Sequence, residues 1–316
     1  MRIAKPGGIL YGIVLMVMLL GGNFQKPVFA QNKTEFASPL KTAENKTMND
    51  STIDGVASKP AKFYQVLEKI LRRRGLKKED ICNQSDAVQM RILHEYGAIF
   101  VAGKAVEPPP VCMFTGAADV EAFQQRIFKA AADIDGTRIE LQTIAMRELL
   151  KAREKAAEKN LSITPRGGAE AARRSFEDTL RLWKSRFEPA CEYWLKAGRL
   201  TSEQVAKLKS LPIKQQVREV LELEKQGIYF NTRFDDSILY SVAAPGTSQH
   251  LSLLALDVAE FENEKVRKIL ARHGWFRTVQ NDTPHFTFLG RRKKKLKKLG
   301  LKKIETAAGE FWIPDI

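Results

Sequence analysis

Cysteine and histidine are scarce in this chain, which has 3 cysteines and 4 histidines among its 316 residues. No two cysteines stand in a Cys-x-x-Cys arrangement, so the sequence gives no sign of a thiolate zinc site. A metal ion, if one is bound, must therefore be held by histidine and carboxylate side chains.

Long apolar runs are also missing, apart from one near the N-terminus. The run from Gly8 to Gly22 follows Arg2 and Lys5 and precedes the small residues of Pro27-Val-Phe-Ala30. It is short for a membrane-spanning helix of about 20 residues, and the three parts together are typical of a secretory signal. We expect a signal peptide over residues 1–30 and an exported protein, periplasmic or extracellular and associated with the cell wall. An uncleaved N-terminal anchor is the alternative.

In an exported protein the three cysteines can form disulfides, because the compartments outside the cytosol are oxidising. Cys82 and Cys112 bracket a segment that contains Pro108-Pro-Pro. We expect a bridge between these two cysteines, with two free thiols as the alternative. Cys191 lies beside Tyr193 and Trp194 in a predicted helix, which favours a buried apolar side chain over a nucleophile.

Positive charge is concentrated in one segment. The formal net charge is +15, and nine Lys and Arg residues lie within residues 291–303. Such a run is either a solvated connection or a binding surface for polyanions. For an exported protein these polyanions are anionic wall polymers or lipid headgroups. Nucleic acid is not expected, because no recognisable nucleic-acid-binding motif accompanies the charge. The oligomeric state stays open.

Composition and periodicity divide the N-terminal half. Residues 31–60 are rich in Ser, Thr, Asn and Lys, which predicts a disordered tether. Residues 61–160 are expected to form a mainly helical region, because apolar residues recur at helical spacing in 63–75 and 115–160. Between those two stretches, residues 96–102 are β-like. This region contains no catalytic constellation, and its role as a structural or wall-targeting element stays open.

Residues 161–316 alternate between helical and strand periodicity. Helices are expected from Phe176 onward, after the capping box Thr201 to Gln204, before Gly227, and over residues 263–273. The strand candidates are residues 228–231, 238–242, 251–258, 275–279 and 286–289. The predicted fold class is α+β, with a small C-terminal antiparallel sheet and helices around a cleft, preceded by the mainly helical region.

Two imidazoles and one or two carboxylates lie in this strand-like sequence. A catalytic zinc ion takes three protein ligands and leaves a position for water, whose pKa it lowers toward about 7. We therefore predict a Zn²⁺ site formed by His250, Asp257 and His285. His250 and Asp257 would lie on opposite faces of one regular strand, so the chain must bend or bulge between them. Asp282, three residues before His285, is the candidate general base.

Each of these residues has a simpler interpretation when it is taken alone. His250 would then be a hydrogen-bonded structural histidine, and Asp257 a helix cap or an ion-pair partner. His273 precedes Gly274 at a predicted helix end, where a cation suits the helix dipole. His94 lies in the helical region. We interpret His273 and His94 as structural.

The sequence motifs around the histidines resemble those of a known family. Pro245-Gly-Thr-Ser-Gln-His-x-x-x-x-Ala-x-Asp257, followed by His285-Phe, is similar to the motifs of the VanY-type zinc D-alanyl-D-alanine carboxypeptidases. These belong to the LAS-type peptidoglycan metallopeptidases, whose patterns are Pro-Gly-x-Ser-Glu-His-x-x-Gly-x-Ala-x-Asp and Glu-x-Trp-His-Phe. The resemblance covers roughly residues 160–290. It implies metal-ligand roles for His250, Asp257 and His285, and the role of base for Asp282.

An upstream element extends the resemblance. Arg173-Arg-Ser-Phe-Glu-Asp-Thr179 is similar to the family's Tyr-Arg-Ser-x-x-x-Gln, which implies that Arg174 binds the substrate carboxylate and stabilises the transition state. A guanidinium suits both tasks, because its forked donors match a carboxylate or an oxyanion. A solvated Arg174 is the alternative, and Arg166 and Arg173 are rivals for the role.

Departures from the family patterns indicate a divergent member. Leu253 stands where the family has Gly, Asp282 where it has Glu, Pro284 where it has Trp, and Thr179 where it has Gln. We expect Leu253 to crowd the floor of the cleft. Ser248 is expected to orient His250 from outside the ligand shell.

The expected function is that of an exported zinc metallopeptidase, a D,D-carboxypeptidase or an endopeptidase, which hydrolyses amide bonds in the stem peptides of peptidoglycan. The sequence does not indicate which of these bonds is cut. A non-catalytic zinc-binding module that binds the cell wall or a partner on the same scaffold is the main alternative. A metal-free basic protein that binds anionic polymers through residues 291–303 is the third.

Overall fold

The computed structural model describes residues 61–316, and these belong to one compact unit. The predicted signal peptide and the predicted tether lie outside the described residues. Within residues 61–316, no helix combines the length and the apolar character that crossing a membrane requires.

The first half of the described chain is helical except for one hairpin. In α1 the buried residues Phe63, Leu67 and Leu71 recur at intervals of four and form one apolar face. The elements are α1 (Lys62–Arg72), α2 (Lys78–Ile81), α3 (Ala87–Tyr96), the 3₁₀ helix η1 (Gly97–Val101), α4 (Ala117–Arg126), β1 (Lys129–Ile134), β2 (Thr137–Gln142) and α5 (Thr143–Ala157).

Two of the expectations for this half are wrong. The helical periodicity expected across 115–160 is interrupted by the antiparallel hairpin β1–β2. Its turn, Asp135-Gly136, has φ values of 50° and 75°, the left-handed conformations that a tight hairpin turn requires. The β-like stretch 96–102 forms η1 instead and is wholly buried. A short, continuous apolar run does not distinguish a buried strand from a buried helix.

The second half begins with helices and ends with small sheets. The predicted capping box at Thr201 and Gln204 is confirmed at the start of α7, and Ser175 and Asp178 form another at the start of α6. The elements are η2 (Ala169–Ala171), α6 (Phe176–Lys196), α7 (Ser202–Ser210), α8 (Ile213–Glu224), η3 (Ile238–Tyr240), η4 (Gln249–Ser252), β3 (Ala255–Asp257), α9 (Glu264–Arg272), β4 (Trp275–Phe276), β5 (His285–Phe288), η5 (Lys293–Leu299), β6 (Leu301–Thr306) and β7 (Gly309–Pro314).

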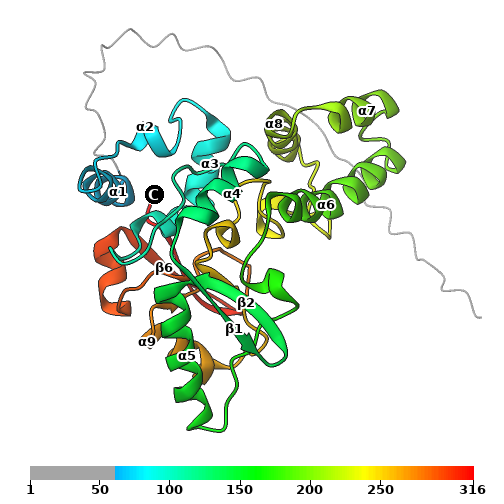
Figure 1. Ribbon diagram of the computed structural model, residues 1–316. Helices are drawn as coiled ribbons and strands as arrows, with labels where there is room; N and C mark the ends of the chain where they lie inside the picture. Colours follow the sequence, from blue (N-terminus) through cyan, green and yellow to red (C-terminus); the bar gives the residue numbers. More distant parts are fainter. Residues whose placement is uncertain (1–60) are drawn as a thin grey trace, which may run out of the picture. The chain divides into compact units, whose positions relative to one another are not determined.

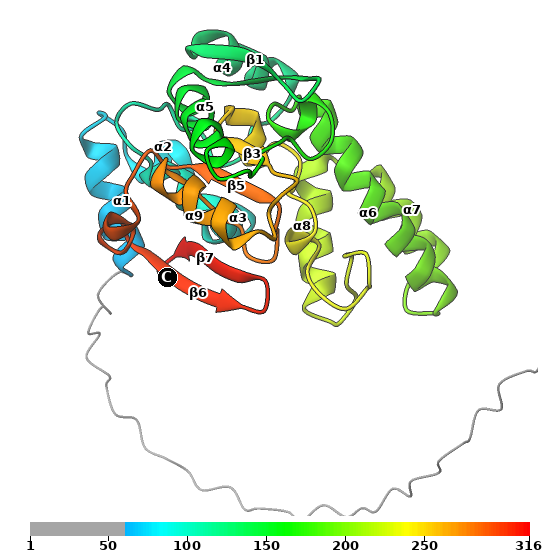
Figure 2. The ribbon, with the colours of Figure 1, turned by 90° about the horizontal axis from the view of Figure 1, so that it is seen from below.

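A three-stranded antiparallel sheet in the order β3-β5-β4 forms the centre of this half. Figure 2 shows β3 and β5 side by side, with α9 close to them. The strands expected at 228–231 and 238–242 are absent, since the first is a loop and the second contains η3. The strands expected at 251–258 and 275–279 are shorter than predicted. The hairpin β6–β7 was not predicted, and the basic run before it forms η5.

One main hydrophobic core joins the two halves. It includes Phe63 of α1, Leu149 of α5, Trp183 of α6 and Trp275 of β4, which are all fully buried. Residues 61–160 and 161–316 are therefore parts of one packed unit. Both views show α6, α7 and α8 grouped on one side of it (Figures 1 and 2). The predicted α+β fold class is confirmed.

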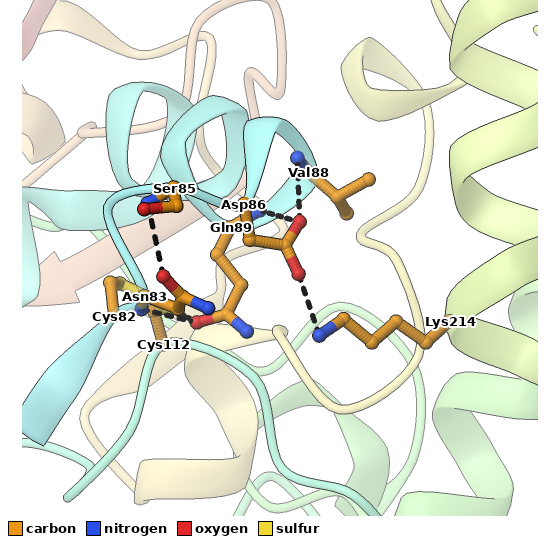
Figure 3. Close-up of a disulfide and its surroundings, with 8 residues drawn as sticks. All are labelled: Cys82, Asn83, Ser85, Asp86, Val88, Gln89, Cys112 and Lys214. Carbon is orange, nitrogen blue, oxygen red and sulfur yellow. Dashed lines mark hydrogen bonds and ion pairs between the residues drawn. A yellow bond between two sulfur atoms is a disulfide. The ribbon is translucent and has the colours of Figure 1, made fainter. Parts of the chain in front are cut away.

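A disulfide joins Cys82 and Cys112, as expected, and these two cysteines are 30 residues apart in the sequence. Figure 3 shows its surroundings at the start of α3, where Asp86 caps the helix by accepting the N–H groups of Val88 and Gln89. The same carboxylate forms an ion pair with Lys214 of α8, at 2.6 Å. Cys191 is a free thiol and is buried, also as expected.

Candidate metal centre

Three short elements bring the predicted ligands together. Asp257 ends β3 and His285 begins β5, and the antiparallel register places them directly opposite each other. His250 lies in η4. The chain bends between His250 and Asp257 at Leu253, whose φ of 58° is left-handed. The predicted bend is thus a 3₁₀ turn followed by one left-handed residue, and it turns His250 toward the opposed pair.

The donor atoms of the three residues form a nearly equilateral triangle. His250 Nε2 lies 3.0 Å from His285 Nδ1, and each of these nitrogens lies 3.3 Å from Asp257 Oδ1. Zinc–nitrogen bonds of about 2.0–2.1 Å in a tetrahedral site set neighbouring donors about 3.3 Å apart. This group of atoms could hold a metal ion.

Hydrogen bonds outside the triangle fix which imidazole nitrogens carry protons. His250 Nδ1 lies 3.2 Å from the carbonyl oxygen of Ala172, and His285 Nε2 lies 2.9 Å from Gln249 Oε1. The amide of Gln249 is itself oriented, because its Nε2 donates to the carbonyl oxygen of Tyr96 at 2.9 Å. Both acceptors are oxygens that only accept, so the outer nitrogens donate. For neutral imidazoles the inner nitrogens are then unprotonated.

Three acceptors therefore face one another without a proton between them. His250 is 1% exposed, and burial, followed by the nearby Arg174, lowers its pKa to about 4. His250 is thus neutral at neutral pH. Arg174 forms an ion pair with Asp257 at 2.7 Å, and this positive charge favours the carboxylate form of Asp257. The lone pairs of two imidazole nitrogens and a carboxylate oxygen therefore face one another at hydrogen-bonding distance. A cation bound between them would remove their mutual repulsion.

The triangle lies in the wall of a cavity of about 200 Å³. Asp282 lines the same cavity and is partly exposed. Burial raises the pKa of the Asp282 carboxyl, His285 opposes this shift, and Asp257 adds to it. The structure therefore places the predicted base beside the predicted ligands.

The cavity contains two arginines, one predicted and one not. Arg174 Nη2 donates to Asp257 Oδ2 at 2.7 Å, so this guanidinium holds a ligand carboxylate. Arg186 of α6 lines the same cavity, and its Nε is buried with no acceptor among residues 61–316. Arg186 was missed because its orientation depends on how α6 packs. The only sequence signal is its position four residues after Leu182, another lining residue.

The rival arginines lie elsewhere. Arg173 forms an ion pair with Glu140 and a hydrogen bond with Gln124. The guanidinium of Arg166 lies 5.1 Å from the centre of the Phe261 ring. Neither residue lines the cavity that contains the metal-ligand triangle.

The remaining predictions have mixed outcomes. Leu253 does not crowd the cavity, because it packs in a separate apolar cluster with Phe114 and Phe176. Ser248 lines the cavity, but the carbonyl of Ala172 orients His250 in its place. The histidines interpreted as structural lie outside the triangle, His94 bonded to Tyr64 and His273 to Glu148.

Comparison with known proteins assigns the chain to no family. The chain matches no protein-family model, and a search of curated proteins finds no similar sequence. The site is therefore defined by its own geometry as a candidate metal centre with two histidine ligands and one aspartate ligand.

Proposed function

We propose that this protein is an exported zinc peptidase that hydrolyses amide bonds in the stem peptides of peptidoglycan. The observation that carries the proposal is the triangle of three unprotonated donor atoms beside Asp282, within one cavity. Two histidines and one carboxylate are a ligand set that catalytic zinc sites use. The motifs that resemble the VanY-type carboxypeptidases support the substrate class.

The ligand residues have defined tasks in this proposal. His250, Asp257 and His285 would hold Zn²⁺, which supplies Lewis acidity and lowers the pKa of bound water. Ala172 and Gln249 keep the two imidazoles in the tautomer and orientation that ligation requires. Arg174 fixes the second oxygen of Asp257, which leaves the first oxygen for the metal.

Asp282 acts as the proton-transfer group. It lines the cavity without forming part of the triangle. Its raised pKa moves the carboxyl toward the range in which a general base both accepts and returns a proton. In the proposed reaction Asp282 takes a proton from the attacking water and delivers it to the leaving amine.

The cavity favours a carboxypeptidase over an endopeptidase. Its volume of about 200 Å³ is below the roughly 300–1,000 Å³ of ordinary ligand pockets, which suits the end of a peptide better than its middle. Arg186 brings a second guanidinium to the cavity wall, and its side chain is partly exposed. We assign the terminal carboxylate of the substrate to Arg186, because Arg174 is already paired with Asp257.

The test is an assay of the full chain on muropeptides, with and without added zinc, read by mass spectrometry. The proposal expects zinc-dependent release of the terminal D-alanine. Full metal occupancy without any cleaved product would favour the alternative, a zinc-binding module that binds the wall without cutting it. One observation fits this alternative. Arg174 is ion-paired with the ligand Asp257, so its guanidinium is already engaged and is less available to bind a substrate.

A further inference from the structure

The hairpin β1–β2 directs alternate backbone groups away from its own pairing. A two-residue turn joins Ile134 to Thr137, and the residues that flank such a turn exchange hydrogen bonds. Bonded and non-bonded positions then alternate along β1. The even-numbered residues of β1 turn their backbone groups toward β2. The odd-numbered residues Lys129, Ala131 and Asp133 turn theirs to the outer edge.

Hydrogen bonds at the end of the hairpin agree with this alternation. Thr143 N donates to the carbonyl oxygen of Phe128 at 3.0 Å, which continues the even-numbered pattern one step before β1. On the far side of β2, Gln142 N donates to the carbonyl oxygen of Leu253 at 3.0 Å, so that edge is partly covered. The outer edge of β1 is open, because the backbone groups of its odd-numbered residues have no hydrogen-bond partner among residues 61–316.

The open edge is accessible, and its middle carries no protecting feature. Lys129, Ala131 and Asp133 are all exposed. Edge strands are commonly protected by proline, by a bulge or by charged side chains, whereas the middle of β1 is Ala130-Ala-Ala132. An exposed edge of this kind is a template for pairing with another strand.

The sequence of the open edge is complementary to itself. A second copy of β1 that pairs antiparallel about Ala131 places Lys129 of one copy opposite Asp133 of the other. Each residue pair of this register can exchange two N–H···O bonds, and opposite charges across a sheet stabilise the pairing. The side chain of Asp133 is 70% exposed, with Arg138 at 3.4 Å, and the exposed Lys129 donates to the carbonyl oxygen of Gln124. Such surface contacts are weak and exchange easily.

An exposed phenylalanine at the end of this edge points to the same partner. Phe128, directly before β1, is 89% exposed, whereas no other exposed large hydrophobic residue among residues 61–316 exceeds 44%. Antiparallel pairing about Ala131 brings Phe128 opposite Ile134 of the second copy, beside its hairpin turn. By symmetry both phenyl rings then lose contact with water, which is favourable.

We propose that two copies of this chain pair through β1 into a symmetric dimer, with Ala131 on the two-fold axis. The two-stranded sheets of both copies then form one continuous antiparallel sheet. The partner is a second copy rather than an unrelated strand, because the register that pairs the charges also pairs every outward backbone group. No residue of β1 lines the metal cavity, so the dimer is independent of the proposed peptidase activity. Small interfaces are weak, and the expected dissociation constant is about 10–100 µM.

The test is sedimentation equilibrium of the full chain over a range of concentrations at physiological ionic strength. Ala131→Pro removes an edge N–H that has no partner in the single chain. This variant should stay folded by circular dichroism, and its dimerisation should be weakened by about 30-fold or more. Ala131→Ser is the matched control, because it keeps the N–H, and it should dimerise as the parent does. Phe128→Ser should weaken dimerisation about 3–10-fold.

An exchange of charges tests the register of the pairing. Lys129→Asp and Asp133→Lys each place like charges opposite each other across the two-fold axis, and each should weaken dimerisation about 3–10-fold. The double variant restores opposite charges and should return to the dissociation constant of the parent. This rescue is specific to self-pairing, because an unrelated strand would not carry the compensating change.

Each outcome decides the proposal. A parent chain that stays monomeric at concentrations far above the expected dissociation constant would overturn it and leave the edge to a strand of another protein. A dimer that Ala131→Pro does not weaken would place the interface elsewhere and would also overturn it. A double charge variant as weak as the two single variants would contradict the proposed register. Loss of dimer in Ala131→Pro, with retention in Ala131→Ser and rescue in the double variant, supports the proposal.

Discussion

The two cavities on either side of β5, the metal cavity and a larger one bordered by α9 and the β6–β7 hairpin, are lined by different kinds of groups. At the metal centre, His250, Asp257 and His285 place three acceptors together with no donor between them. Across the strand, the wall of the larger cavity carries exposed cations, and its aromatic side chains are buried. Buried polar groups are normally satisfied, so the three facing acceptors indicate that the metal centre binds a cation.

The supporting contacts differ as well. The metal centre is fixed by groups whose only evident task is to orient ligands, namely Ala172, Gln249 and Arg174. The second cavity has one buried arginine, Arg277, one half-buried arginine, Arg267, and an exposed rim. Rigid placement suits a small ion with demanding geometry, whereas an exposed rim suits the electrostatic attraction of a larger ligand.

The largest expected effect is a loss of activity without a loss of zinc, when the proposed base is replaced and the metal ligands are kept. Asp282→Asn should lower kcat on muropeptides by about 10²–10⁴-fold, because the amide cannot accept the proton. Zinc content, measured by elemental analysis, should stay unchanged. Unaltered kcat would remove Asp282 from the mechanism.

Loss of the disulfide should affect stability without affecting either cavity. Neither Cys82 nor Cys112 lines the metal cavity or the larger cavity across β5. For a separation of 30 residues, the Cys82→Ala and Cys112→Ala double variant should lose about 3–4 kcal/mol of unfolding free energy, measured by urea denaturation. At temperatures where the variant is folded, its zinc affinity should equal that of the parent. A loss of zinc affinity would link the bridge to the metal centre.

The pH dependence of stability should report on the metal centre alone. The pKa of His250 is about 4 in the folded protein, against about 6.5 in an unfolded chain. Between these values the unfolded state binds more protons, so stability falls as pH drops from about 6.5 to 4. For the zinc-free protein the loss from His250 should be about 3 kcal/mol. His250→Gln should lose less over the same range, and equal slopes would contradict a buried neutral imidazole.

The smallest effect should come from the groups that orient the ligands. Gln249→Leu removes the acceptor of His285 Nε2 and should weaken zinc binding by about 10–100-fold. A competition assay with a chelator measures this change. Ser248→Ala is the matched control, because Ser248 lines the same cavity without holding either imidazole. An equal loss in both variants would argue against an oriented His285.

The sequence predicted the ligands better than their supports. His250, Asp257 and His285 were recognised by residue type and motif. Gln249 and Arg186 were not, because their roles depend on how η4 faces Tyr96 and how α6 packs over the cavity. Orientation of this kind is set by tertiary contacts rather than by spacing.

The missed hairpins have local causes. The apolar spacing across 115–160 predicts a helix, and Ala130-Ala-Ala132 in β1 does not oppose it, because alanine is the strongest helix former. The turn at Asp135-Gly136 was the stronger signal. At the C-terminus, the charge of residues 291–303 indicates a solvated connection or a polyanion-binding surface, and neither interpretation predicts the strand that begins at Leu301.

Metal content tests the central claim most directly. The full chain is incubated with zinc, freed of unbound metal and analysed for its elements, together with His285→Ala and the control His273→Ala. The account predicts one zinc per chain in the parent and in His273→Ala, because His273 is bonded to Glu148 outside the triangle. It predicts loss of the ion in His285→Ala. A parent chain without metal, or equal metal in both variants, would contradict it.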